Sequence, residues 1–119
     1  MCGSFKINIL GSTWDVCIVE PSNDDRLENT DGFCDWTDSK IVIANRMNEG
    51  NLQAPWSYLL KVIRHELIHA FMRESGLGEC AFNDQDMEEI MVDWIAIQWY
   101  KIEKAIDEAT TKAREIVIG

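Results

Sequence analysis

The chain has 119 residues and a mass of 13.7 kDa, which suits one folded domain and is too short for a catalytic domain with a separate lobe. Its 46% hydrophobic content indicates a globular protein, whereas a formal net charge of -10 disfavours phosphate backbones and anionic lipid as partners. We therefore expect a single domain over residues 1–119, with no nucleic-acid and no membrane partner.

The N-terminus and the cysteines both favour a cytoplasmic setting. The sequence MCGSFKINIL lacks the basic region and the long apolar run of a signal peptide, and no stretch approaches about 18 consecutive apolar residues. The four cysteines are scattered, without a C-x-x-C pair, so we expect small reduced thiols instead of disulfides or a thiolate zinc site. They are Cys2, Cys17, Cys34 and Cys80.

Residues 1–50 predict a small, mostly antiparallel sheet. Residues 5–20 alternate apolar and polar side chains around a Gly-Ser turn, and residues 21–31 are polar and rich in turn formers. Two further short strands are expected on either side of a polar turn, at 33–36 and 41–44. The segment KIVIAN, residues 40–45, is either an edge strand that pairs with an extended peptide or an interior strand, and the sequence does not choose.

From Pro55 onward the apolar period changes to that of a helix. Apolar residues recur at three- and four-residue steps, Ser57 is expected to cap the N-terminus, and Gly76 is placed as a C-terminal stop. The sequence therefore predicts a helix over residues 55–76 that lies in the middle of the domain.

A second, longer helix is predicted over residues 84–116, which contain no Gly or Pro. We expect a bend near Tyr100. The part after this residue either packs on the domain or projects as an arm for a homo-oligomer. The tryptophans are interpreted as core and helix-packing residues: Trp14, Trp36, Trp56, Trp94 and Trp99.

Both histidines of the chain lie in the first helix, in the motif H-E-x-x-H. His65 and His69 are one turn apart on one helix face, so their imidazoles can reach one tetrahedral cation. Glu66 lies roughly 60° around the helix from His69, where it can act as a general base without binding the metal. The alternative is a pair of core histidines, which explains poorly why three polar side chains share an apolar helix.

A catalytic zinc site normally has three protein ligands. The metzincin pattern would require glycine at 72 and histidine at 75, but the sequence has Met72 and Ser75. Without a third histidine, a carboxylate is expected, and the second helix offers Glu88, Glu89 and Asp93 in MEEIMVDW. Glu89 and Asp93 share one face, one turn apart, whereas Glu88 points about 100° away.

These features resemble the gluzincins, in which a ligand Glu is followed four residues later by an Asp that orients a zinc-bound histidine. Glu89 and Asp93 match this pair, and Glu89 follows His69 by 20 residues (89 minus 69). Over residues 32–99 the chain also resembles the ImmA/IrrE-like metallopeptidases of Gram-positive bacteria and their phages. The resemblance implies an α+β zincin-like fold, with zinc bound by His65, His69 and Glu89, Asp93 behind a histidine, and a bacterial host cytoplasm if the gene is carried by a phage.

The expected function is peptide-bond hydrolysis by a zinc-dependent peptidase, in which Glu66 takes a proton from a water that zinc acidifies. Neither tyrosine, Tyr58 or Tyr100, is well placed by its spacing to stabilise an oxyanion. Two alternatives stay open, a zinc-stabilised binding module with lapsed or weak catalysis and a metal-free helical interaction protein. The intact Glu66 argues against the first, because a structural site has no use for a base there.

Overall fold

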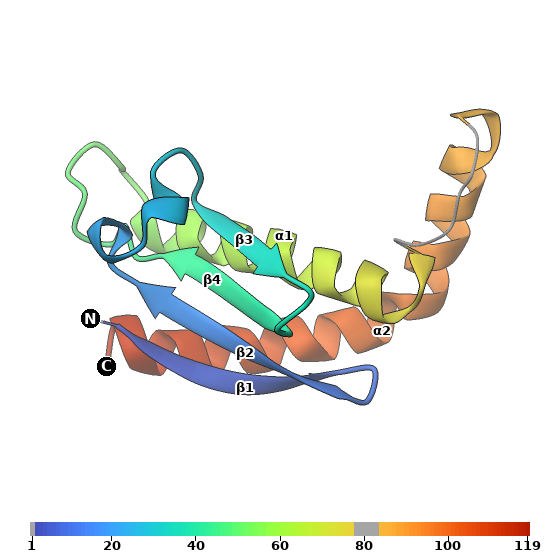
Figure 1. Ribbon diagram of the computed structural model, residues 1–119, viewed down its shortest axis with the longest axis horizontal. Helices are drawn as coiled ribbons and strands as arrows, with labels where there is room; N and C mark the ends of the chain where they lie inside the picture. The colour runs from blue at the N-terminus through green and yellow to red at the C-terminus, as the bar shows by residue number, and fades with distance from the viewer. Residues whose placement is uncertain (1, 78–83) are drawn as a thin grey trace.

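The computed structural model describes residues 2–77 and 84–119, without the side chains of residues 84–89, 92 and 93. Four strands precede two long helices, so the fold is α+β as predicted (Figure 1). The strands are β1 (Gly3–Ile9), β2 (Ser12–Val19), β3 (Gly32–Asp35) and β4 (Lys40–Ala44), and the helices are α1 (Pro55–Glu74) and α2 (Asp84–Val117).

The sheet is mixed, with the order β1-β2-β4-β3. The hairpins β1–β2 and β3–β4 are antiparallel, as predicted, but β2 and β4 pair in parallel. The cause is the connection of residues 20–31, which carries the chain two strand positions beyond β2 before β3 begins, so that one position stays open between them. Strand β4 then returns between β2 and β3. The KIVIAN segment is therefore an interior strand, and the short β3 forms the edge opposite β1.

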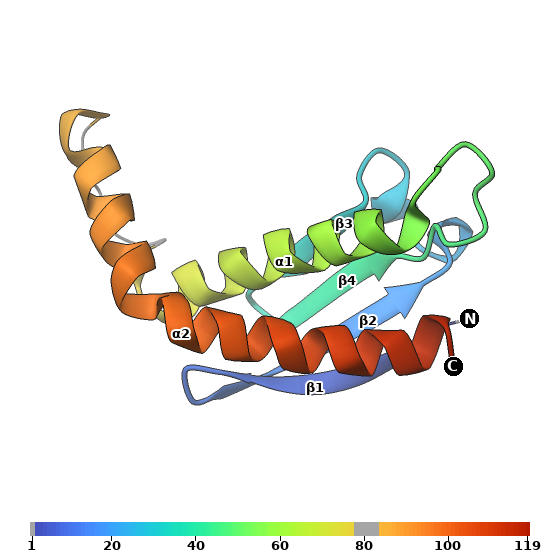
Figure 2. The same ribbon diagram turned by 180° about the vertical axis from the view of Figure 1, so that it is seen from behind.

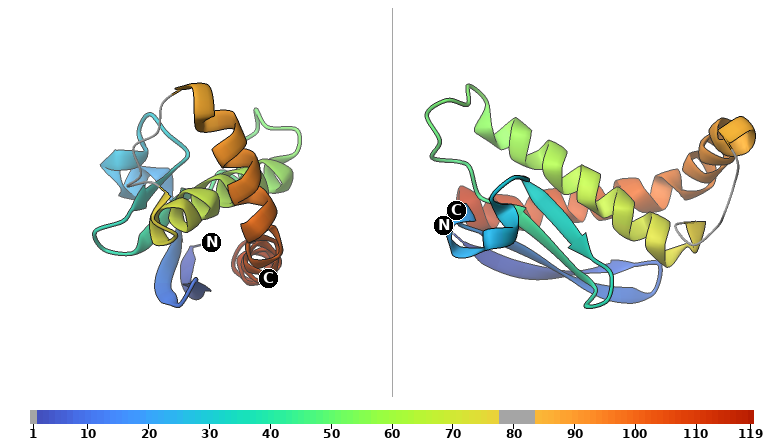
Figure 3. Two further views of the ribbon diagram at one scale, coloured as in Figure 1. Left: turned by 90° about the vertical axis from the view of Figure 1, so that its right-hand side faces the viewer. Right: turned by 45° about the horizontal axis from the view of Figure 1, so that its top comes forward.

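Both helices pack on one face of the sheet (Figures 2 and 3). That face contributes alternate residues of its strands to a core with the inner sides of α1 and α2. Its largest buried side chains are those of Ile9, Trp14, Val16, Ile18, Ile41, Ile43, Ile63, Leu67, Phe71 and Ile102. A smaller cluster around Leu27 covers part of the opposite face.

Helix α1 begins two residues earlier than Ser57, the predicted cap. Ala54 is the N-cap without a side-chain hydrogen bond, and Pro55 is the first helical residue. Proline suits this position because its fixed φ is helical and it has no N–H to leave unpaired. The predicted end is confirmed, since Gly76 takes a φ of +83° and donates its N–H to the Arg73 carbonyl at 3.1 Å.

Two features fix α1 on the sheet. A Cβ built on Gly32 of β3 would lie 3.0 Å from Val62 Cγ1 and 3.1 Å from the Val42 carbonyl oxygen, so α1 approaches the edge strand as closely as glycine permits. At the C-terminal end of the helix, the Glu74 carboxylate accepts hydrogen bonds from Ser12 Oγ at 2.9 Å and Trp14 Nε1 at 2.7 Å. Helix α1 is thus held against β3 near its middle and against β2 at its C-terminal end.

Helix α2 has the bend that the sequence predicts, with an N-terminal segment that projects from the sheet and a longer segment that runs alongside it (Figures 1 and 2). Ile102, Ala105, Ala109 and Ala113 of the longer segment are buried in the core, so this part packs on the domain. In the described part of the chain, no helix combines the length and the apolar character needed to cross a bilayer.

We predict that Gly32→Ala destabilises the fold, because the added methyl group forces α1 away from β3. The free energy of unfolding should fall by about 1–3 kcal/mol, the usual cost of overpacking. Gly50→Ala is the matched control, since nothing lies within 4 Å of its built Cβ. Denaturant unfolding of both variants measures the difference, and equal stability of the two would contradict the close approach.

Candidate metal centre

The two motif histidines converge on one point above α1. Both are exposed, and their Nε2 atoms lie 3.1 Å apart, with the ring centroids at 4.8 Å and the ring planes at 68°. Two nitrogens bound to a tetrahedral zinc at about 2.0–2.1 Å would be about 3.3 Å apart. The pair therefore fits a shared cation, and imidazole is a preferred zinc ligand.

Glu66 lies beside the histidines but on the inner side of the helix. Its side chain is buried, with a relative exposure of 7%. It lies on the side of α1 that packs on the sheet, together with Ile63, Leu67 and Ala70. Burial raises the pKa of this carboxyl above its ordinary value, and the neighbouring imidazoles of His65 and His69 oppose the rise. A carboxyl with a raised pKa next to two potential metal ligands is suited to exchange protons.

A cavity of about 490 Å³ opens over these three residues, between α1 and the end of β3. It is lined by Thr30, Gly32, Phe33, Cys34, Trp36, His65, Glu66, His69, Met72 and Arg73. The motif is therefore accessible from the free edge of the sheet, where an extended ligand can approach it.

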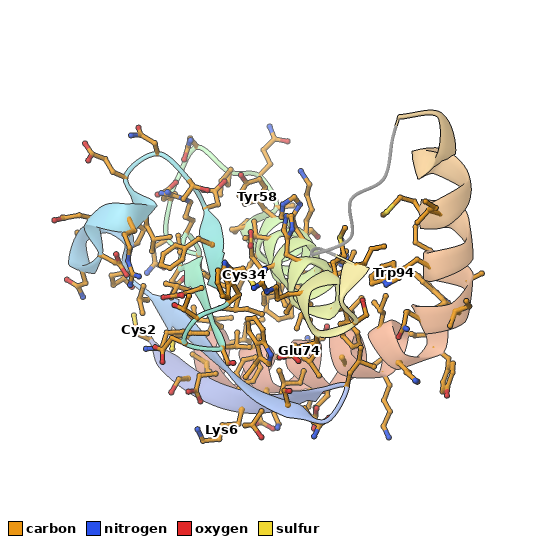
Figure 4. All side chains as sticks on the ribbon, turned by 45° about the vertical axis from the view of Figure 1, so that its right-hand side comes forward. Cys2, Lys6, Cys34, Tyr58, Glu74 and Trp94 are labelled. Carbon is orange, nitrogen blue, oxygen red and sulfur yellow. The ribbon has the colours of Figure 1, made fainter. Side chains whose placement is uncertain are left out.

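Cys34 is a cavity residue that the sequence reasoning missed. It lies between β3 and α1 (Figure 4), with its Sγ 3.9 Å from the Glu66 carbonyl oxygen. Burial, with a further contribution from the charge of Glu66, raises the pKa of the thiol to about 12, so the thiol stays protonated in the metal-free protein. The alternation of side chains in GFCD places Gly32 and Cys34 on one face of the strand. The sequence does not show that α1 is the element that packs on this face. Cys2, Cys17 and Cys34 are free thiols, as predicted, and Cys80 lies outside the described residues.

A second cavity of about 180 Å³ adjoins the first at Gly32, His65 and Glu66 and includes Tyr58. The Tyr58 hydroxyl donates a hydrogen bond to the Asp31 carboxylate, which also accepts one from Arg46 Nε at 2.6 Å. Hydrogen bonding to Asp31 raises the pKa of Tyr58. Tyr58 is thus nearer to the histidines than its spacing suggested, but its proton is already donated. Tyr100, by contrast, lines a separate cavity.

The expectation that all tryptophans are packing residues is wrong for two of them. Trp14 and Trp94 are buried and Trp56 packs against the core, whereas Trp36 and Trp99 have relative exposures of 54% and 53%. Trp36 follows the edge strand directly and so has no neighbouring strand to cover it. Trp99 lies in the charged α2, on the side away from the core.

The predicted third ligand falls in a part of the chain whose side chains are not described. Glu89 and Asp93, with the competing Glu88, belong to α2, and their side chains lie outside the described residues. Within the described side chains, no group of three His, Cys, Asp or Glu residues is arranged to hold a metal. Trp94 Nε1 donates to Ser75 Oγ at 2.9 Å, so the helix that carries these acids is attached to the end of α1.

Comparisons of the chain with protein-family models, with curated proteins and with solved structures found no match. The site must therefore be interpreted from its own chemistry.

We predict that the metal-free Glu66→Gln variant is more stable than the parent at pH 7. The folded protein holds this carboxyl at a raised pKa, so its ionisation costs stability as the pH rises through that value. The gain in Tm should decrease as the pH falls through the raised pKa of Glu66, and it should be absent below about pH 4.3, the ordinary pKa of glutamate, where both states are protonated. Glu103→Gln, at an exposed site of α2, is the control and should leave the Tm unchanged. A Glu66→Gln variant with an unchanged or lower Tm would contradict the buried, destabilising charge.

Proposed function

We propose that this chain is a zinc-dependent peptidase that hydrolyses a peptide bond with Glu66 as general base. The observation that carries the proposal is the convergence of His65 Nε2 and His69 Nε2 at 3.1 Å beside the buried Glu66, at the floor of an open cavity. A pair of core histidines would be buried and would have hydrogen-bond partners in the core, whereas these two rings are exposed and face one another. Zinc would be held by both histidines and by Glu89 of α2.

The residues of the site have separate roles. Bound zinc would supply Lewis acidity towards a carbonyl oxygen and a water molecule. Glu66, whose pKa burial raises, would accept a proton from that water and deliver it to the departing amine. Asp93, one turn after Glu89, would orient the imidazole of His65 by accepting its second N–H.

The free edge of β3 would bind the peptide. The Asp31 carbonyl accepts the Ala44 N–H at 2.9 Å and so faces β4. Backbone groups alternate in direction along a strand, so those of Gly32 and Cys34 face the cavity. One of them, the Gly32 carbonyl, accepts the Thr30 hydroxyl at 3.1 Å. An extended peptide could therefore add to this edge as a further strand, with its backbone above the histidines.

The alternative of a zinc-stabilised binding module is favoured by one observation. Peptidases of this kind stabilise a developing oxyanion with a donor, and the nearest tyrosine hydroxyl, that of Tyr58, already donates to Asp31. A peptidase and a zinc-stabilised binding module would share the metal and the peptide-binding edge of β3. They would differ in whether the bound peptide is cleaved.

Glu66→Gln tests the proposed chemistry. The variant should bind one zinc per chain like the parent, because the amide keeps the shape of the side chain, while kcat on a mixture of unfolded peptides falls by about 10²–10⁴-fold. Glu103→Gln should retain full activity. Metal analysis and mass spectrometry of the products measure both quantities. Undiminished cleavage by Glu66→Gln would rule out its role as base, and zinc binding without any cleavage by the parent would favour the binding module.

The third ligand is tested by two adjacent variants. Because Glu88 and Glu89 are about 100° apart on a helix, one of them at most can face the histidines. Glu89→Ala should weaken zinc binding by more than the 10–100-fold typical of a residue behind a ligand, whereas Glu88→Ala should bind like the parent. Zinc titration of the purified variants measures this. Loss of zinc binding in Glu88→Ala with normal binding by Glu89→Ala would contradict the assignment and would make Glu88 the third ligand.

A further inference from the structure

The cleft has a direction, because β3 and α1 run the same way along it. Gly32 lies against Val62, Cys34 Sγ is 3.9 Å from the Glu66 carbonyl oxygen, and Trp36 stacks on Arg73. Successive positions of the strand thus meet successive turns of the helix. The histidines lie between the two ends of the cleft.

The two ends differ in chemistry. The Gly32 end leads into the smaller cavity of about 180 Å³, whose lining includes the charged side chains of Asp31 and Lys61 and the phenol of Tyr58. The other end belongs to the cavity of about 490 Å³ and presents the ring of Trp36 and the thioether of Met72. Only the second end offers a broad apolar surface to a side chain of a bound peptide.

Trp36 is the dominant part of that surface. It is 54% exposed although it is the largest side chain lining the cavity. The guanidinium carbon of Arg73 lies 3.6 Å from the centre of its indole ring, a cation–π contact that holds the ring against the last turn of α1. A rigid, partly exposed tryptophan beside a candidate catalytic site is a typical anchor for a ligand side chain.

We propose that Trp36, held by Arg73, forms the subsite that selects a large apolar or aromatic side chain of the substrate. A peptide that pairs antiparallel with β3, the more stable mode per residue, runs from the Trp36 end to the Gly32 end. The selected residue therefore lies on the N-terminal side of the bond that is cleaved. Met72 adapts to its shape because a thioether side chain is flexible and polarisable. This inference rests on the proposed function and adds a substrate class to it.

The test compares Trp36→Ala with Trp99→Ala, which removes a tryptophan of nearly equal exposure outside this cavity. The zinc-loaded proteins are incubated with a peptide mixture of all sequences, and the cleaved bonds are mapped by mass spectrometry. The parent and Trp99→Ala should favour Phe, Tyr, Trp, Leu or Met on the N-terminal side by about tenfold or more over Ala. Trp36→Ala should lose this preference but still cleave peptides with small residues there, and Trp36→Phe should restore part of it.

A binding measurement separates the subsite from catalysis. In a Glu66→Gln background, peptides with Phe or Ala at the selected position are titrated against the chain with and without Trp36→Ala. Trp36→Ala should weaken binding of the Phe peptide about tenfold and leave the Ala peptide unchanged. Two results would overturn the subsite alone. One is cleavage in which the preference for a large apolar side chain survives Trp36→Ala, and the other is a preference on the C-terminal side of the cleaved bond. Trp36-dependent binding without cleavage by the parent overturns the peptidase and keeps the subsite. If the parent neither cleaves peptides nor binds them in a Trp36-dependent way, the peptidase and the subsite are both overturned.

Discussion

The close contact between α1 and the edge strand is the constraint on which the candidate site depends. Gly32 leaves little space for a Cβ between β3 and the middle of the helix, and Glu74 fixes the C-terminal end of α1 through Ser12 and Trp14. With the helix held at these two points, its rotation is set by its buried stripe. This rotation places the imidazoles of both histidines outside the core, over the free edge of the sheet at β3.

Glu66 shows how the same packing changes the acidity of a side chain. The helix phase that exposes the histidines turns the residue between them inward, so its carboxyl loses water and its pKa rises. The fold gains nothing from this burial at neutral pH, since the charged form is destabilised. Burial of the Glu66 carboxyl beside two potential metal ligands lowers the stability of the fold. Such a cost is expected where a side chain is kept for a functional role and not for packing.

Charge at the site departs from the charge of the whole chain. The net charge of -10 suggests a cationic partner, yet α1 exposes Lys61 and Arg64 beside its histidines. The two acids of the helix do not offset them, because Glu66 is buried and the Glu74 carboxylate is hydrogen-bonded to β2. The surface that a peptide would meet is thus less acidic than the composition implies, and the apolar area around Trp36 adds contacts that are independent of charge.

The sequence by itself determined the features that depend on neighbours along the chain. The strand and helix positions, the stop at Gly76, and the placing of His65 and His69 on one face follow from local periodicity, and the structure agrees with them. The identity of the edge strand was decided only by tertiary structure, because the order of strands depends on pairing between distant segments. Only that order brought Cys34 and Trp36 of the edge region next to the histidine helix.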